Sequence, residues 1–508
     1  MKKALLLLVT LLASLSAWAQ NEIPIDSSNF PDDNFRNWLL SRPYGSDGVL
    51  TDGEIAAIIT IDVSSNSIAD LTGIEHLTAL KNLYCIGNQL TELNVSHNTA
   101  LIFLACNNNQ LTELDVSHNT ALDKLYCYNN QLTALDVCQN TALKNLNCSD
   151  NQLTELKVNQ NMALETLDCS NNQLTGLDVS QNTALEVLYC SNNQLAQLDV
   201  RQNTALKRLR CSNIQLTQLD VSQNTALAYL CCSNNQLTAL DVCQNTALET
   251  LDCSNIQLAE LDVSQNTALE VLYCSSNQLT VLDVSQNTAL GYLDCSGNQI
   301  NGGNMEALVA GLTTVDVDYW GENGSFIVID LDSETEQNVI TTTQVGTARG
   351  KNWTVYGLIG DDWQEYDGSE PTYYAISLPE SFENGSVTCD KTEAAEGETV
   401  TLTVTPDEGY ELELLTVAYF DEPYEAPNRA PKSTDIDLTP GDNGTYTFEM
   451  PAAPVNVSAT FKESAVTGVV DLNAATAKSG QRFNVMGQPV GSDYRGIVIE
   501  NGKKRVIK

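Results

Sequence analysis

The residues of this 508-residue chain that could do chemistry recur at a fixed interval. Eleven cysteines stand 21 residues apart: Cys85, Cys106, Cys127, Cys148, Cys169, Cys190, Cys211, Cys232, Cys253, Cys274 and Cys295. A strict period indicates a solenoid, in which each unit contacts only its neighbours. Stacked parallel strands place successive thiols about 4.8 Å apart, with parallel Cα–Cβ vectors that disfavour a disulfide. We therefore expect buried, reduced thiols that pack as small apolar groups.

Four further cysteines lie outside this column, namely Cys138, Cys231, Cys243 and Cys389. They are the better candidates for reactive thiols. Aspartates form a second column, interrupted by Asn94 and Lys157, which comprises Asp115, Asp136, Asp178, Asp199, Asp220, Asp241, Asp262 and Asp283. Weak cation binding is one interpretation, and we favour the other, in which each carboxylate caps its own turn.

Enzyme signatures are missing from the sequence. There is no zinc-protease, nucleophile-elbow, P-loop or dinucleotide-binding motif. His97 and His118 stand one unit apart, where zinc bridging is conceivable, but each replaces a glutamine common at that position. The sequence therefore predicts no catalytic residues, no metal site and no cofactor.

The elements that would carry these columns are short strands. Each unit, called a rung below, reads L-x-x-L-x-C-S-x-N-Q-L-T-x-L-D-V-S-Q-N-T-A. Alternation in both L-x-C and L-D-V predicts a strand in each half. Stacking then gives two parallel sheets on opposite sides of a flattened coil. Inward asparagines satisfy buried backbone groups, and altered turns are expected where Ile214 and Ile256 replace the first asparagine.

The outward positions of the L-x-C strand vary, and they are rich in tyrosine and arginine. This composition is typical of binding hot spots, although tyrosine and valine also simply favour strands. We predict ligand binding by Tyr84, Phe103, Tyr126, Tyr128, Tyr189, Arg208, Arg210, Tyr229, Tyr273 and Tyr292.

The repeat resembles the 21-residue leucine-rich repeats of exported Bacteroidota proteins and, more distantly, those of the internalins. Residues 63–80 resemble an ordinary internalin repeat with one extra residue. The resemblance implies a leucine-rich-repeat solenoid and a binding protein. Residues 483–490 and the strands around Asn501-Gly502 resemble a C-terminal sorting domain of the type IX secretion system, which implies that secretion machinery recognises this tail.

The flanking segments complete a mainly β fold class. Lys2 and Lys3, an apolar stretch and Ala17-Trp18-Ala19 predict a signal peptide over residues 1–19. We expect an N-terminal cap at 20–60, repeats at 61–300, a C-terminal cap at 301–366, an acidic linker, a small β-sandwich module at 372–462 and a β-hairpin tail at 464–508. In the N-terminal cap, Pro31 is expected to open a helix, and residues 46–54 are read as a capped helix start rather than a partial calcium loop.

Charge limits the partners. The net charge of −40 repels phosphate backbones, so nucleic acid is a poor ligand, and no later segment reaches membrane-spanning length. The sequence predicts an exported, surface-exposed or secreted adhesin-like protein that binds another macromolecule, with a protein preferred, through its repeat sheet. Glycan binding and a structural role without a specific ligand are the alternatives.

Overall fold

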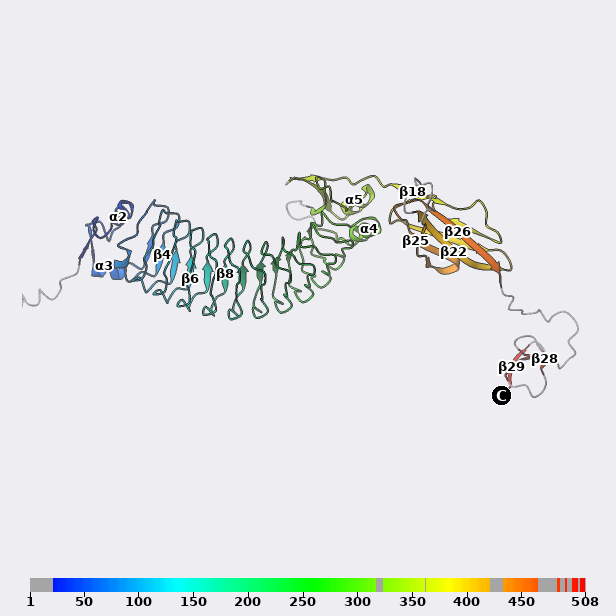
Figure 1. Cartoon of the computed structure of the whole chain (residues 1–508), viewed down its shortest axis with the longest axis horizontal. Coiled ribbons are helices and arrows are strands. Elements are labelled where there is room, and N and C mark those ends of the chain that lie inside the picture. The colour runs from blue at the N-terminus through cyan, green and yellow to red at the C-terminus, as the bar shows by residue number, and fades with distance from the viewer. Residues whose placement is uncertain are drawn as a thin grey trace, which may run out of the picture. The chain divides into compact units, whose positions relative to one another are not determined.

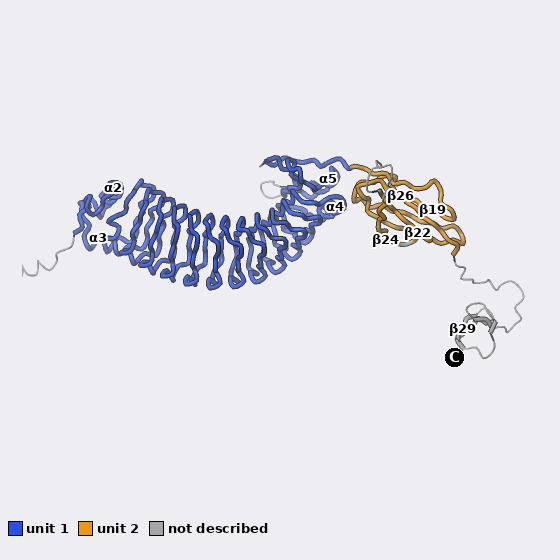
Figure 2. The backbone as a smooth tube through the Cα atoms, in the orientation of Figure 1, with its two compact units in different colours: residues 1–371 blue, residues 372–508 orange. Residues whose placement is uncertain are grey.

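The computed structural model describes residues 22–316, 323–360, 362–420 and 433–464, together with short strands in the C-terminal tail. The chain forms two compact units, residues 1–371 and residues 372–508 (Figure 2). The expected signal peptide lies outside the described residues. Among the described residues, none of the helices combines the length and apolar character needed to cross a bilayer.

A small cap precedes the repeats. It contains β1 (Glu22–Pro24), α2 (Asp33–Leu40), β2 (Val49–Thr51) and α3 (Asp52–Ala57), and β1 pairs antiparallel with β2. The helix begins later than Pro31 suggests, because the Asp32 carboxylate accepts the Phe35 N–H at 2.9 Å and acts as the cap. Phe35 is fully buried and belongs to the hydrophobic core that continues into the repeats. The predicted helix start at Thr51 is confirmed, since Thr51 and Glu54 form a reciprocal capping box.

The repeats form one 15-stranded sheet that runs in chain order from β3 to β17 (Figure 1). Its repeat strands are β3 (Thr60–Asp62), β4 (Asn82–Tyr84), β5 (Phe103–Ala105), β6 (Lys124–Tyr126), β7 (Asn145–Asn147), β8 (Thr166–Asp168), β9 (Val187–Tyr189), β10 (Arg208–Arg210), β11 (Tyr229–Cys231), β12 (Thr250–Asp252), β13 (Val271–Tyr273) and β14 (Tyr292–Asp294). Neighbours pair in parallel, residue for residue. A 3-10 turn, η1 (Ile74–His76), lies in the first rung.

The interior of the stack consists of repeated leucines, valines and the cysteine column. All eleven column thiols are buried and free, as predicted. Burial in an apolar environment raises the pKa of these thiols, to about 12 at Cys106 and Cys190. They are inert packing groups rather than nucleophiles.

Two inward asparagine columns bind the backbone that turns out of each half. In the first, Asn193 Nδ2 donates to the carbonyls of Cys169 and Cys190 at 3.0 and 3.1 Å. Its Oδ1 accepts the Leu174 N–H at 2.9 Å. The carboxamide thus links consecutive rungs, which is the expected role.

Altered turns at the two isoleucine rungs are confirmed. Beside Ile214 and Ile256, the following glutamines Gln215 and Gln257 adopt positive φ values of 68° and 66°. In regular rungs that glutamine has ordinary backbone geometry, and its N–H donates to the preceding rung, as Gln194 does to Leu174 at 2.8 Å.

One part of the fold prediction needs correction, although the mainly β solenoid is confirmed. The L-D-V segments stack but do not form a second sheet, and within the described residues they contribute a single parallel bridge, Asp136 to Lys157. The reason is local. Each column aspartate accepts the N–H two residues later, which removes that donor from pairing between rungs. The bridge occurs where lysine replaces the aspartate.

The C-terminal cap extends the same sheet. It contains α4 (Gly302–Gly311), β15 (Gly324–Asp330), α5 (Thr342–Arg349), β16 (Trp353–Ile359) and β17 (Asp362–Glu365). β15 and β16 continue the parallel order, whereas β17 returns antiparallel against β16. The expected acidic linker therefore begins as an edge strand. Val315 and Asp316, which lie between α4 and β15, are not part of a strand.

The second unit is a pair of β sheets around a common core. One sheet contains β20 (Glu393–Ala395), β18 (Tyr373–Ser377), β26 (Val455–Glu463), β22 (Tyr410–Phe420) and β23 (Ser433–Asp435), and the other β19 (Gly385–Cys389), β21 (Thr399–Pro406), β25 (Thr445–Glu449) and β24 (Thr439–Pro440). Val400, Leu402, Val417 and Phe448 fill the space between them. Asn443 and Gly444 both have positive φ values within the short 3-10 turn η2 (Asp442–Gly444), which precedes β25.

The tail forms a separate small sheet in the order β28 (Pro489–Val490), β27 (Arg482–Asn484), β29 (Gly496–Glu500) and β30 (Lys503–Ile507). β29 pairs antiparallel with β30, which confirms the expected hairpin. Residues 465–481, 485–488, 491–495, 501–502 and 508 of the proposed sorting domain, which include the Asn501-Gly502 turn, lie outside the described residues.

Candidate functional site

The candidate site is the sheet face, defined as the outward side chains at the first and third positions of the strands β4 to β14. Each pair flanks an inward leucine that is fully buried. The outward residues are half-buried or exposed, except Ala105. The strands therefore present two parallel columns of accessible side chains, about 4.8 Å apart from rung to rung.

The predicted residues fall into three clusters. The N-terminal cluster consists of Tyr84, Phe103 and Tyr126. The ring centroids of Tyr84 and Phe103 are 4.8 Å apart, and those of Phe103 and Tyr126 are 5.3 Å apart in an edge-to-face arrangement. Tyr128 is half-buried in the turn after the strand.

The central cluster is built around an arginine. The Arg210 guanidinium carbon lies 5.1 Å from the ring centroids of both Tyr189 and Tyr229, on the neighbouring strands. Distances below about 6 Å are typical of cation–π contacts. Arg208 lies two residues earlier on the same strand, and among β4 to β14 the strand β10 is the one whose outward residues are both exposed.

The C-terminal cluster contains two residues that the sequence analysis missed. The rings of Tyr273 and Tyr292 lie 4.8 Å apart, as their adjacent rungs predict. Trp363 from β17 lies 5.7 Å from Tyr292 and 5.9 Å from Tyr356, and it is 49% exposed. Trp363 escaped prediction because the acidic residues around it indicate a linker rather than a strand. The alternation of apolar Trp353 and Val355 with Thr354 and Tyr356 was the signal that the sheet continues.

Polar rungs separate these clusters. Asn145, Asn147, Thr166 and Asp168 occupy β7 and β8, between the N-terminal and central clusters. Three strand spacings, about 14 Å, separate Tyr126 from Tyr189. The predicted residues thus make three local patches rather than one continuous surface.

Carboxylates lie beside the central and C-terminal clusters. Asp252 Oδ2 accepts hydrogen bonds from the Cys231 thiol and the Ser233 hydroxyl, both at 2.9 Å. Burial raises the pKa of Asp168 and of Asp294 above the ordinary value. Burial also raises the pKa of Cys231, and Asp252 adds to that shift. Cys231 is therefore held as a thiol, and the expectation that it is reactive finds no support.

The opposite side of the solenoid is uniform. The predicted capping role of the aspartate column is confirmed, since all eight accept the N–H two residues later at 2.8 to 3.1 Å. Hydrogen bonds from Arg201 lower the pKa of Asp199 to about 2. These carboxylates stabilise turns inside their own rungs.

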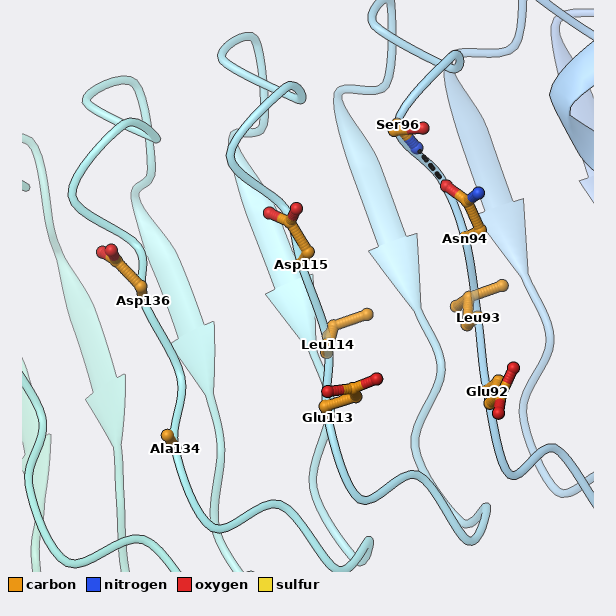
Figure 3. A pocket seen from close by; sticks show the side chains of 9 residues that line it. All are labelled: Glu92, Leu93, Asn94, Ser96, Glu113, Leu114, Asp115, Ala134 and Asp136. Carbon is orange, nitrogen blue, oxygen red and sulfur yellow. Dashed lines mark hydrogen bonds between the residues drawn. The ribbon is translucent and has the colours of Figure 1, made fainter.

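A shallow acidic hollow lies on this side, over three successive rungs (Figure 3). Glu92, Glu113, Asp115 and Asp136 line it, and Asn94 accepts the Ser96 N–H as the aspartates do in other rungs. Asp115 and Asp136 belong to the aspartate column, and their carboxylates already accept the N–H groups two residues later. In the parts of the chain that the structure describes, no group of three or more His, Cys, Asp or Glu residues is arranged to hold a metal ion. His97 and His118 contact the serine that precedes each of them.

Comparisons with known proteins agree with this architecture. A family model described as leucine-rich repeats (two copies) matches residues 163–203. A second model, described as a divergent InlB B-repeat domain, matches residues 380–421, which run from the approach to β19 into the end of β22.

Two individual matches are informative, and both are to Internalin J (InlJ). The chain is 43% identical over 68 residues to Internalin J of Listeria monocytogenes, a match that spans 13% of this chain and 7% of that protein. It is also similar to a solved structure titled "Functional domain of InlJ from Listeria monocytogenes includes a cysteine ladder". That structure has 30% sequence identity and a TM-score of 0.54, and the match covers 87% of this chain and 99% of the other.

Proposed function

We propose that this chain, which belongs to the internalin-like family of leucine-rich-repeat proteins, binds another protein through the sheet face. The repeat fold is typical of protein-binding surface proteins. Adhesion is the role we assign, without catalysis and without a cofactor.

The contrast between the two sides of the solenoid carries this proposal. The interior and the aspartate side repeat the same residues in nearly every rung, so they serve the fold. The outward strand positions of the sheet face vary, and they display aromatic and arginine side chains in packed clusters. Such side chains dominate the energetics of protein interfaces.

The proposal is tested by binding the purified chain to an array of secreted and cell-surface protein ectodomains. A sheet-face variant carries Tyr84→Ser, Tyr126→Ser and Tyr273→Ser, which spares the central cluster. A matched variant replaces the exposed Gln181, Gln223 and Gln265 by alanine on the aspartate side. We expect partners of the wild-type chain to lose at least about tenfold in affinity for the first variant only, since hot-spot residues contribute about 2 kcal/mol or more. Equal binding by both variants would mean that the wrong face has been chosen.

Glycan capture is the second candidate, and one observation favours it. Trp363 is half exposed and lies in a cluster with Tyr292 and Tyr356, which is an arrangement suited to stacking on sugar rings. A glycan array with wild-type chain and a Trp363→Ala variant decides between the two. Sugar binding that the substitution abolishes would favour the second candidate.

We further propose that the protein is exported and acts at the cell surface or after secretion. The basic and apolar residues before Gln20 support a signal peptide. The β29–β30 hairpin supports a sorting role for the tail, with the second unit as a spacer module. Mass spectrometry of the secreted protein tests this, because a processed form would begin near Gln20 and end before β27.

A further inference from the structure

We propose that Arg208 and Arg210 bind a single, isolated carboxylate on a protein partner, such as one Asp or Glu side chain in an exposed segment. This inference rests on the proposed protein-binding function and names the chemistry of its central cluster.

Arg208 and Arg210 carry positive charges that form no ion pair among the described residues. The chain carries 65 acidic and 25 basic residues, so a cation on its surface readily finds a carboxylate. Eight described cations do so within 4.0 Å: Arg36, Lys144, Lys157, Arg201, Lys207, Arg349, Lys391 and Lys462. Within the described residues, Arg208 and Arg210 have no such ion pair, although both are exposed on the same strand. Two adjacent positive charges therefore face outward.

The Arg210 guanidinium is preorganised for binding. The contacts with Tyr189 and Tyr229 hold the Arg210 guanidinium in place on both sides. Residues i and i+2 of a strand point to the same face, about 6.6 Å apart. A fixed guanidinium offers a planar fork that matches a carboxylate, and a second arginine beside it supplies further donors.

The surroundings indicate how many carboxylates the partner presents. Asp168 and Asp252 lie in the same column as Arg210, each two strands away on opposite sides. The backbone positions of these aspartates thus lie two strand spacings, about 10 Å, from that of Arg210. The aspartates would repel the second and third charges of a polyanion, while a single carboxylate flanked by hydrogen-bond donors complements the pattern.

The same geometry favours a peptide over a sugar at this cluster. The faces of Tyr189 and Tyr229 that turn towards Arg210 already contact its guanidinium. They are therefore not free to stack on a sugar ring. Half-buried Val187, which pairs with Arg208 in register, adds an apolar contact beside the charge.

The test uses the full chain and an array of short peptides in matched pairs. One member of each pair contains a single Glu among Lys and Ser residues, and the other has Gln in its place. A double variant, Arg208→Gln with Arg210→Gln, removes the proposed site. The matched control, Lys81→Gln with Lys124→Gln, removes two cations that likewise form no ion pair among the described residues, and it leaves the central cluster intact. Polyglutamate and a sialic-acid-terminated oligosaccharide are the further probes.

We expect the wild-type chain and the lysine control to prefer Glu peptides over their Gln partners by at least about tenfold. The arginine variant should lose that preference. Equal binding of Glu and Gln peptides, no binding of any Glu peptide, a preference that survives in the arginine variant, or tighter binding of polyglutamate would each overturn the inference. Peptide binding without a Glu preference would leave the proposed protein-binding function standing. Binding of the oligosaccharide alone would contradict both this inference and the proposed protein-binding function.

Discussion

The first asparagine column predicts a sharp difference between two substitutions of the same type. Each Cys carbonyl at the end of a regular strand receives two carboxamide donors, one from its own rung and one from the next. Cys169 O, for example, accepts from Asn172 at 3.1 Å and from Asn193 at 3.0 Å. This redundancy explains why isoleucine is tolerated at position 214, because the carbonyls on either side keep one donor each.

Asn235 lies between the two isoleucine rungs and has lost that redundancy. It is the sole carboxamide donor to Cys211 O and Cys232 O, at 2.8 and 2.9 Å. It also accepts the N–H groups of Ile214 and Leu216. Asn235→Ile would therefore leave both carbonyls unpartnered inside the stack.

Asn172→Ile is the matched substitution in a regular rung. Cys148 O would keep the donor of Asn151 at 3.2 Å, and Cys169 O would keep that of Asn193. Only the Leu153 N–H loses its acceptor. An unmade hydrogen bond at a buried group costs about 1–3 kcal/mol, and Asn235→Ile leaves three more such groups than Asn172→Ile, namely two carbonyls and one N–H. It should therefore destabilise the chain by roughly 3–9 kcal/mol more.

Urea unfolding followed by far-UV circular dichroism, together with hydrogen exchange of the amides around each rung, measures the difference. The double variant Ile214→Asn with Asn235→Ile is the internal control, because the new carboxamide restores a donor to Cys211 O. It should recover about half of the loss. Equal destabilisation by the two single isoleucine substitutions would refute the reasoning.

Three further predictions follow from other contacts. Hydrogen bonds lower the folded-state pKa of Asp199 from 3.8 to about 2, so its contribution is present above pH 3.8 and is lost as the pH falls towards 2. Asp199→Asn should therefore lower the urea midpoint at pH 7 by a small amount, since the pair is exposed, and the difference should vanish near pH 2. Iodoacetamide should modify the partly exposed Cys138 in the native protein, whereas the buried Cys190 should react only after unfolding, as mass spectrometry of the labelled peptides will show. Thr51→Ala removes the capping box of α3 and should cost about 0.5–2 kcal/mol, read as faster hydrogen exchange over residues 52–57, while Ser46→Ala should leave that exchange unchanged.

The sequence predicted most of the solenoid because its signals are local and repeated. A cysteine every 21 residues defines the interior, and an asparagine at a fixed offset defines the turn. The altered turns at Ile214 and Ile256 were also predictable, since a missing carboxamide has a direct effect on its neighbours.

The parts that escaped prediction depend on competition or on tertiary contacts. The L-D-V alternation is a valid strand pattern, but the side chain of Asp115 or Asp178 captures the donor that a second sheet would need. Trp363 joins Tyr292 only because β17 folds back on β16, and no short-range pattern reports such a return. The 21-residue register predicts that Arg210 lies between Tyr189 and Tyr229 on the neighbouring strands. Its contact with both rings depends on side-chain conformations, which the register does not determine.

The register from β4 to β14 has a consequence for how such a chain can change. Every strand pairs with its neighbours at the same three positions, so one rung is a physically interchangeable cassette. Unequal recombination between near-identical segments would insert or delete whole cassettes, lengthening or shortening the rod without misaligning its interior. Each inserted or deleted rung would carry its own outward side chains. The order of charged and aromatic rungs on the sheet face could therefore change while the interior packing stayed the same.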